Sequence, residues 1–354
     1  MKLLLTCTTG LEAATSLEVK RMGFKIIDST AGRIFIEARL EDIPRLNLWL
    51  RTAERVYIVL NEKKVENFDA LFQAINEIEW ERYISSGKIL ISDVSTRNSK
   101  LSAKGAIISV ATAAINKKIR KKAKEQLYPI RLILKNNKLL VLLDTTGPKA
   151  LSKRGYRLKT SKAPIRETIA AAMVLLSRWN GSVPLIDPFC GSGTILFEAA
   201  LMILGISPGI KRNFVSENWD IFRNYWLLER KKVINCKNNR IFEHKIIGFD
   251  RDFKILSVAE KISKKLNLDF IEFKVKNFEE LLPNKEELYI ITNPPYGERI
   301  KSNVDFSTIF QKFPKANVYI LSPDNNFEKI VGKKATKKIR FQNSGIWVWY
   351  YMFY

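Results

Sequence analysis

The segment VPLIDPFCGSGT, residues 183–194, is the most informative part of this 354-residue chain. A short apolar stretch ends in Asp187, a loop containing Gly191 and Gly193 follows, and an apolar segment with helical periodicity comes next. A strand, a glycine loop and a helix in this order predict the first unit of a doubly wound α/β sheet, in which ligands bind beyond the carboxyl ends of the strands. Leu196 stands where a dinucleotide fingerprint has its third glycine, and no Lys-Ser or Lys-Thr pair makes a phosphate loop.

Outward from this segment, strand-like and helix-like stretches alternate to the end of the chain. This alternation predicts a doubly wound, mostly parallel sheet of the Rossmann-like kind for the second half. The last run, IWVWYYMFY (346–354), is a core strand or an exposed aromatic patch; its length and the preceding turn favour the strand. We expect strands at 183–187, 246–250, 270–275, 289–292 and 317–323, and helices at 165–178, 195–204 and 253–266.

Two carboxylates end predicted strands beside the glycine loop. Asp187 precedes the loop, and Asp250 ends the next strand, IIGFD. A carboxylate at the first position favours a ligand with a positively charged amino group over a pyrophosphate, and Asp250 is placed to accept hydrogen bonds from ribose hydroxyls. A GxG sequence alone is often only a tight turn, but together with both carboxylates it indicates a ligand site.

The tetrapeptide Asn293-Pro294-Pro295-Tyr296 directly follows the predicted strand YIIT, which places it at the same edge of the sheet. An exocyclic amine on a nucleobase is a poor nucleophile, because its lone pair is conjugated into the ring. The Asn293 side-chain oxygen and the Pro294 carbonyl can each accept one N–H and so direct the lone pair toward an incoming methyl group. Pro295 stiffens the turn, and Tyr296 can stack on an extruded base. The alternative is a structural turn with a buried tyrosine.

The first half of the chain predicts a smaller α+β unit, similar to a ferredoxin-like fold, followed by a second α+β segment. Asn136-Asn137 is expected to form a hairpin turn, and the polar stretch 152–164 is the best candidate boundary. The predicted strands are 2–7, 24–29, 33–38, 55–60, 88–95, 130–135 and 139–144, and the predicted helices are 11–22, 44–52, 68–78 and 102–127.

The charge is strongly unbalanced. The net charge is +24, and residues 101–160 alone hold 15 basic and 2 acidic residues. Clustered lysines and arginines of this kind indicate a surface that contacts nucleic-acid phosphates, although a merely solvated lysine-rich surface is the plainer alternative. The residues predicted to contact nucleic acid are Lys104, Lys117, Lys118, Lys121, Lys122, Arg154 and Arg157.

Several classes of protein are disfavoured by composition. No apolar run approaches the ~18–20 residues that span a bilayer, and the start of the chain does not resemble a signal peptide. The three cysteines are widely spaced, which fits a reducing cytoplasm. His244 is the only histidine, so we expect neither a metal site nor a Ser-His-Asp triad.

These residues resemble the class I S-adenosylmethionine-dependent amino-methyltransferases, and more narrowly the THUMP-domain RNA guanine-N2 methyltransferases. The resemblance covers nearly the whole chain. It implies a ferredoxin-like part at 1–42, extending to about residue 60, a THUMP RNA-binding domain at 43–148, a linker at 149–163 and a methyltransferase domain at 164–354. Its motifs are CTTGLEAATSLEVKRMGF, LWLRTAERV, SKRGYRLKTSKAPIRETIAAAM, DPFCGSGTILFEAA, SPGIKRNFVSENWD, NPPYGERI and NFEKIVGKKATKK.

The resemblance also implies a cofactor, S-adenosylmethionine, and the residues around it. Asn277 stands where the family commonly has an acidic residue that meets the adenine amine; its amide oxygen can still accept a hydrogen bond. Cys190 lines the loop without a nucleophilic role, since amine methylation needs none. The implied cofactor residues are Ala163, Pro164, Thr168, Asp187, Pro188, Phe189, Cys190, Gly191, Ser192, Gly193, Thr194, Asp250, Arg251, Asn277 and Phe278.

The resemblance implies methylation of the guanosine N2 amine in RNA, with large-subunit rRNA as the first substrate and tRNA as the second. A DNA adenine-N6 methyltransferase is a further alternative that the tetrapeptide alone permits, and an RNA-binding protein without activity is another. Nothing demands an oligomer, so a monomer is expected. The aromatic residues of the 205–245 insertion either form a base-stacking lid or, as we favour, pack as a satellite core over the cofactor helix.

Overall fold

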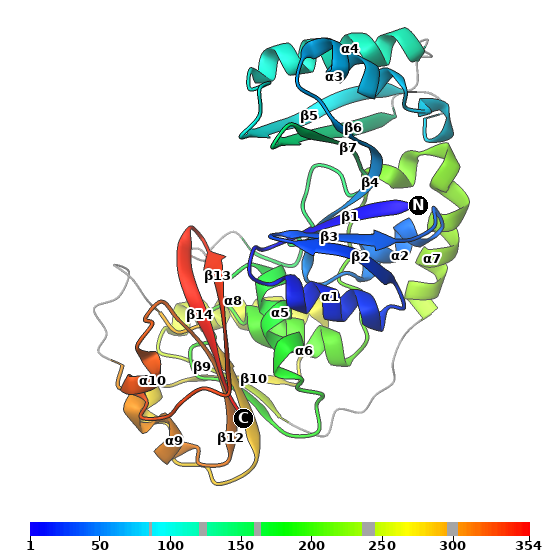
Figure 1. Ribbon diagram of the computed structural model, residues 1–354. Coiled ribbons are helices and arrows are strands. Elements are labelled where there is room, and N and C mark those ends of the chain that lie inside the picture. Colours follow the sequence, from blue (N-terminus) through cyan, green and yellow to red (C-terminus); the bar gives the residue numbers. More distant parts are fainter. Residues whose placement is uncertain (85–86, 120–125, 159–163, 236–244, 296–303) are drawn as a thin grey trace.

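The computed structural model describes residues 1–84, 87–119, 126–158, 164–235, 245–295 and 304–354 (Figure 1). The described residues form two seven-stranded sheets, one in each half of the chain. The first sheet has the strand order β2-β3-β1-β4-β7-β6-β5, and the second has the order β10-β9-β8-β11-β12-β14-β13. Each expected fold class is therefore confirmed in its half.

The first six elements form the ferredoxin-like unit that the sequence predicts. Their order is strand, helix, strand, strand, helix, strand, and β1 lies between β3 and β4 in an antiparallel arrangement. The unit includes the whole of α2 and part of β4, so its end lies closer to residue 60 than to residue 42. The elements are β1 (Lys2–Cys7), α1 (Glu12–Arg21), β2 (Lys25–Thr30), β3 (Arg33–Glu37), α2 (Asp42–Trp49) and β4 (Ala53–Lys64).

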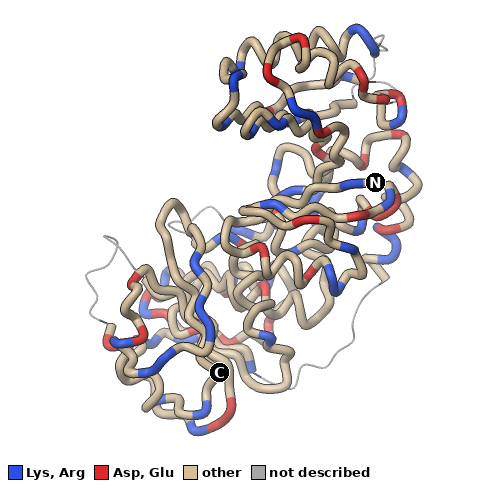
Figure 2. The backbone as a smooth tube through the Cα atoms, viewed as in Figure 1, with Lys and Arg blue, Asp and Glu red and all other residues tan. Residues whose placement is uncertain are grey.

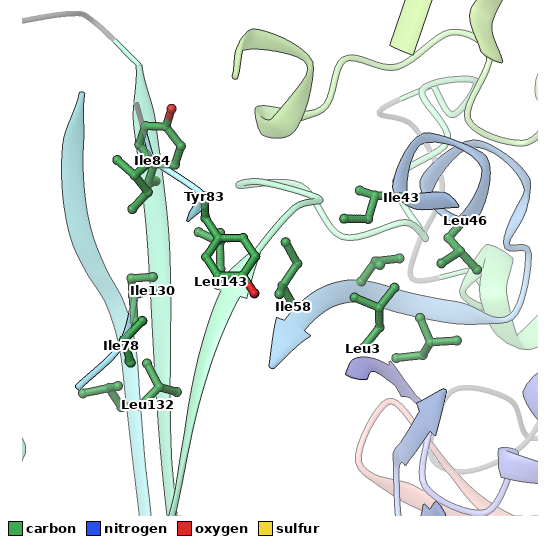
Figure 3. Close-up of a cluster of buried hydrophobic side chains, with 14 of the residues drawn as sticks. Leu3, Ile43, Leu46, Ile58, Ile78, Tyr83, Ile84, Ile130, Leu132 and Leu143 are labelled. Carbon is green, nitrogen blue, oxygen red and sulfur yellow. The ribbon is translucent and has the colours of Figure 1, made fainter. Parts of the chain in front are cut away.

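The remaining elements of the first half extend the same sheet. The 12-residue strand β4 pairs with β1 through its first half and with β7 through its second half. Figure 3 shows the resulting shared core, in which Leu3 and Ile58 from the first unit lie with Leu143 from the second. The added elements are α3 (Phe68–Asn76), β5 (Lys88–Arg97), α4 (Lys104–Lys118), β6 (Leu127–Lys135) and β7 (Lys138–Asp144).

The basic helix is shorter than expected. Helix α4 ends at Lys118, and Leu127 already begins β6, so the expectation of one helix over 102–127 is wrong. Its apolar face is as expected, with Ile107, Ala114 and Ile115 buried. The hairpin between β6 and β7 is also confirmed: Asn136 and Asn137 have φ angles of 53° and 61°, which suit a tight hairpin turn.

The second half is a parallel sheet with an antiparallel edge. Strands β10, β9, β8, β11 and β12 run parallel, whereas β14 is antiparallel to β12 and β13 is antiparallel to β14. Successive side chains of β12 point to opposite faces of the sheet and pack in two different hydrophobic clusters. Both faces of the sheet are therefore covered, as in doubly wound folds. The sequence analysis missed β13.

The bounds of these elements follow. The strands are β8 (Leu185–Asp187), β9 (Ile246–Asp250), β10 (Ile271–Val275), β11 (Leu288–Thr292), β12 (Ala316–Ser322), β13 (Lys337–Asn343) and β14 (Ile346–Phe353). The helices are α5 (Glu167–Ser177), α6 (Thr194–Ile203), α7 (Arg223–Asn235), α8 (Phe253–Leu266), α9 (Ile309–Lys312) and α10 (Phe327–Ile330). The final aromatic run is a core strand, as expected, since Val348 and residues 350–353 are buried.

Several aromatic residues in the described part of the 205–245 insertion are buried against the first half of the chain. Trp219, Phe222 and Trp226 belong to the same core as the N-terminal sheet, and Trp219 stacks on Tyr128 of β6 with ring centroids 4.7 Å apart. A satellite core is therefore correct, but it covers the N-terminal half rather than the cofactor helix. These rings are not available as a base-stacking lid.

Candidate active site

The carboxyl ends of three neighbouring parallel strands meet at one edge of the second sheet. Strand β8 lies between β9 and β11, and Asp187 at its end pairs in register with Gly248 of β9. Asp250 ends β9, and Thr292 ends β11 immediately before the tetrapeptide. The two carboxylates, the glycine loop and Asn293 are therefore brought together, as the sequence predicts.

The glycine loop is held close to β9 by small residues. Gly191 and Gly193 have φ angles of +52° and +81°, a region that side chains disfavour. A Cβ on Gly193 would lie 2.8 Å from Cζ of Phe197. A Cβ on Gly248 would lie 2.8 Å from Sγ of Cys190, so this glycine of β9, absent from the predicted site, also allows the loop its close approach.

Asp187 is buried in a polar pocket at the end of β8. Its Oδ1 accepts hydrogen bonds from Oγ1 of Thr292 at 2.6 Å and from the backbone N–H of Phe189 at 3.1 Å. Burial raises the pKa of the Asp187 carboxyl to about 7, against the lowering effect of these hydrogen bonds, and the charge of Asp250 acts in the same direction as burial. A cation bound beside this carboxyl would favour its ionised form.

Asp250 fixes the loop from the neighbouring strand. Its Oδ2 accepts a hydrogen bond from the N–H of Gly191 at 3.0 Å, and its Oδ1 accepts one from the N–H of Asp252 at 3.0 Å. Arg251 is exposed just beyond it. The carboxylate thus lies against the glycine loop, where the sequence places a partner for ribose hydroxyls.

Cys190 is buried within the loop. Its thiol has a pKa well above the usual value, because of burial and the nearby carboxylates of Asp187 and Asp250. The sulfur is therefore a protonated packing group at neutral pH, in agreement with the expectation that it is no nucleophile. Pro188, Ser192 and Thr194 are buried beside it.

Asn293 has the most unusual environment of the tetrapeptide. Its side-chain Oδ1 is shielded from solvent and has no hydrogen-bond partner within the part of the chain that the structure describes. A buried unpaired acceptor is costly, and it marks a position where a donor from a ligand would be favourable. Pro294 is buried and Pro295 is exposed, while Tyr296 lies outside the described residues.

The predicted adenine-side residues differ in their environments. Phe278 is buried and stacks on Phe189, with ring centroids 5.6 Å apart, so one face of Phe189 is supported by protein. Asn277 is exposed, and its side-chain amide donates to Oε1 of Glu280 at 3.2 Å.

Thr168 connects the site to the first half of the chain. Its hydroxyl donates to Oε1 of Glu54 on β4 at 2.6 Å, so this side chain is occupied by a bond between the two halves. Glu54 was not predicted, because contacts across sheets leave no periodic signal in sequence. Pro164 is partly buried, and Ala163 lies outside the described residues.

The predicted RNA-contacting residues fall into two groups, the lysines in and after α4 and two arginines that are buried or partly buried. Lys104, Lys117 and Lys118 are exposed on α4, the helix at the top of the molecule, where Figure 2 shows both basic and acidic segments. Lys121 and Lys122 lie outside the described residues.

Arg154 is buried, in contrast to the prediction of an RNA contact. Its guanidinium donates to the carbonyl oxygen of Leu151 at 2.6 Å and to that of Arg51, and its Nε lies 3.5 Å from Glu198. This side chain joins Leu151 to Arg51 and Glu198 in the protein interior, so we remove it from the RNA-contacting set. Arg157 is partly buried and pairs with Glu167 at 2.9 Å.

The described residues contain no cluster of three or more metal-ligating side chains. Within the same ranges, no helix is long and apolar enough to cross a membrane. The donor set at the sheet edge fits the cofactor that the sequence implies: the carboxylates of Asp187 and Asp250 suit an ammonium group and a diol, and a Cβ on Gly191 would have no protein atom closer than 4.0 Å, which leaves room for close approach.

Comparison with known proteins gives consistent relatives. The chain is 34% identical over 371 residues to a protein of Bacillus subtilis (strain 168) named as the RNA methyltransferase YpsC, covering 99% of this chain and 95% of that protein. It is 29% identical over 373 residues to the ribosomal RNA large subunit methyltransferase K/L of Aliivibrio fischeri, covering 98% of this chain. The chain spans about half (52%) of the length of that enzyme.

Solved structures and family models agree with this. The structure of SMU.472, described as a methyltransferase complexed with SAH, has a TM-score of 0.92 and 31% identity, covering 100% of this chain and 97% of that chain. A model described as the RlmL ferredoxin-like domain matches residues 2–57. A model described as the RMKL-like methyltransferase domain, UPF0020, matches residues 154–347. The chain therefore belongs to the UPF0020 family of RMKL-like methyltransferases.

Proposed function

We propose that this chain transfers a methyl group from S-adenosylmethionine to the exocyclic N2 amine of a guanosine in RNA, with large-subunit rRNA as the substrate. The observation that carries the proposal is the buried, unpaired Oδ1 of Asn293 next to the Asp187 loop. The names of the relatives, an RNA methyltransferase and an rRNA large subunit methyltransferase, support RNA as the substrate class.

The proposed mechanism rests on positioning. When bound, S-adenosylmethionine supplies an electrophilic methyl group on a sulfonium, whose departure requires no acid. Oδ1 of Asn293 accepts one N–H of the target amine, and the Pro294 carbonyl accepts the other, so that the nitrogen lone pair points toward the donor. Asp187 and Asp250, at the ends of the neighbouring strands β8 and β9, would hold the cofactor. The protonated product loses its proton to water, and no enzyme base is needed.

The first half supplies the proposed RNA-binding surface. Residues 43–148 are proposed as a THUMP domain, joined through the linker at 149–163 to the methyltransferase domain at 164–354. The net charge of +24 and the exposed lysines of α4 favour a polyanionic partner. An rRNA substrate implies that the protein acts in the cytoplasm.

Two alternative substrates remain within the same mechanism. A tRNA guanine-N2 enzyme would use the same tetrapeptide and the same basic surface. A DNA adenine-N6 enzyme would also use the tetrapeptide, but the first half of the chain resembles an RNA-binding module rather than a reader of DNA sequence.

Methyl transfer from labelled S-adenosylmethionine into separated, unmodified rRNA, tRNA and DNA tests the proposal. Nucleoside analysis should find N2-methylguanosine in large-subunit rRNA. The same nucleoside in tRNA would identify tRNA as the substrate and leave the proposed mechanism unchanged. N6-methyladenine would show that guanine is not the target base. The variant Asn293→Ala should lose transfer by about 100-fold or more while RNA affinity stays within about twofold. A fully active Asn293→Ala protein would contradict the mechanism.

A further inference from the structure

The antiparallel hairpin β13–β14 presents an exposed face of basic and aromatic side chains that the proposed function has not used. Side chains alternate along each strand, so one face of the hairpin contributes to the core through Phe341, Val348 and Tyr350. The opposite face buries Tyr351 and Phe353 in a second core cluster, and its remaining side chains, here called the hairpin face, are Lys338, Arg340, Gln342, Trp347 and Trp349. Trp347 is 44% exposed.

The hairpin face lies at the same edge of the sheet as the tetrapeptide. Thr292 pairs with Ile320 between β11 and β12, and Ser322 pairs with Trp349 between β12 and β14. Continuing this register by two residues places Pro294 level with Trp349. Pro294 and Trp349 are therefore separated by two strand spacings, about 10 Å at ~4.8 Å per strand. Trp347 lies two residues before Trp349, further beyond the carboxyl ends of the parallel strands.

The hairpin also contacts the first half of the chain. Figure 1 shows β13 and β14 extending toward the N-terminal half. A Cβ on Gly10, which precedes α1, would lie 2.1 Å from the carbonyl oxygen of Arg340, so the two backbones touch. The hairpin face is therefore continuous with the region between the basic N-terminal half and the catalytic edge.

Arginine and tryptophan on this face are arranged in a way that suits nucleic acid. The Arg340 guanidinium lies 4.8 Å from the ring centroid of Trp347 and 5.6 Å from that of Trp349. Among the described residues it forms no ion pair with a carboxylate, unlike Lys338, which pairs with Glu328 at 2.6 Å. Exposed aromatic rings beside an unneutralised cation are the elements of a single-strand binding platform.

Protection of a sheet edge explains only part of this surface. Charged residues on an edge strand discourage pairing with other chains, which accounts for the lysines and the arginine of β13. An exposed tryptophan has the opposite effect, because it adds apolar surface next to that edge. Edge protection therefore does not explain the exposure of Trp347.

We propose that the hairpin face binds the single-stranded RNA next to the target nucleotide. Trp347 stacks on an unpaired base, and Arg340 neutralises a backbone phosphate. This inference rests on the proposed function and adds the part of the surface that holds the flanking nucleotides close to Asn293.

Fluorescence anisotropy with a labelled single-stranded RNA oligonucleotide, and with a duplex of the same sequence, tests the inference without reference to catalysis. Trp347→Ala should weaken binding of the single strand by about 5- to 100-fold and binding of the duplex much less. Trp347→Phe should restore most of the affinity. Tyr354→Ala is the matched control, because Tyr354 is 62% exposed just beyond the opposite end of β14, and this variant should bind as the wild type does.

The methyl-transfer assay separates the two proposals. With an RNA that the wild type methylates, Trp347→Ala should raise KM for RNA with little change in kcat and no change in affinity for S-adenosylmethionine. Wild-type KM and wild-type single-strand affinity in Trp347→Ala would overturn this inference and leave the proposed function intact. Absence of RNA methylation by the wild type would overturn the proposed function. The anisotropy measurement would still show whether the hairpin face binds single-stranded RNA.

Discussion

Thr292 donates a 2.6 Å hydrogen bond to Asp187, which joins the strand before the tetrapeptide to the strand before the glycine loop. Both residues are buried, and they end neighbouring strands of the sheet. The bond stabilises the ionised carboxyl within a site whose burial disfavours charge. It therefore couples the residue expected to hold the cofactor to the segment expected to hold the target amine.

Thr292→Val removes this bond with little change in shape. The pKa of Asp187 should rise further above its raised value of about 7, so that less carboxylate is present at neutral pH to bind an ammonium group. We expect the Kd of S-adenosylmethionine, measured by calorimetry at pH 7, to rise about tenfold or more. Thr292→Ser keeps the hydroxyl and should bind as the wild type does; equal weakening in both variants would contradict the role of the bond.

Cofactor affinity should depend on pH because of Asp187. Below its pKa of about 7, the free carboxyl is protonated and must release that proton before it pairs with a cation. Affinity should therefore increase by up to about tenfold between pH 6 and pH 7, and binding at pH 6 should release protons that calorimetry detects in buffers of different ionisation enthalpy. Asp187→Asn should bind weakly at both pH values. If cofactor affinity of Asp187→Asn depended on pH as strongly as that of the wild type, a group other than Asp187 would be responsible for the pH dependence.

Gly248→Ala should displace the glycine loop, because Gly248 of β9 lies directly against it. The new methyl group would meet Sγ of Cys190 and Cδ1 of Leu196 at less than 3 Å, so the loop must move away from β9. We expect a loss of about 1–3 kcal/mol in the free energy of unfolding, measured with urea, together with weaker cofactor binding. The control is Gly105→Ala in α4, where nothing lies within 4 Å and stability should be unchanged or slightly higher. If Gly248→Ala were as stable as Gly105→Ala, close packing against the loop would not be the reason for the glycine at position 248.

The basic surface of α4 can be tested through salt. Replacing Lys117 and Lys118 by alanine should weaken RNA binding and reduce the slope of log affinity against log salt by about 1.5. The matched control replaces Lys261 and Lys264, two exposed lysines of α8 in the other half, and should leave the slope unchanged. Equal slopes in all three proteins would show that the RNA lies elsewhere.

Local patterns in the sequence predicted most of the fold. The alternation that indicates β8, β9 and β11 and the turn signal at Asn136-Asn137 depend on residues close in the chain, and these elements are confirmed. The glycine loop and both carboxylates were also found this way, because parallel strands bring their carboxyl ends to one edge.

Features that depend on distant contacts were missed or misplaced. Thr292 bonds to a residue 105 positions away, and its pairing requires knowledge that β11 lies next to β8. The end of α4 at Lys118, where Ile119 has an extended backbone, was not seen, since the lysine-rich sequence after it has high helix propensity and contains no Gly or Pro. Arg154 was assigned to the surface because its local sequence is basic, although its partners come from both halves.

Arg154→Ala tests this last reassignment. Its guanidinium is buried with Glu198, a fully buried carboxylate of α6 that also accepts a hydrogen bond from the Tyr156 hydroxyl at 3.0 Å. Removing the cation leaves the Glu198 charge without its partner and frees the carbonyl oxygen of Arg51, so the free energy of unfolding should fall by about 3–5 kcal/mol. The comparison variant Lys153→Ala removes an exposed charge next to Arg154 and should change the free energy of unfolding by about 0.5 kcal/mol or less. An Arg154→Ala protein with wild-type stability and weakened RNA binding would restore the surface role, whereas lost stability at unchanged salt dependence of RNA binding assigns this residue to the junction between the halves.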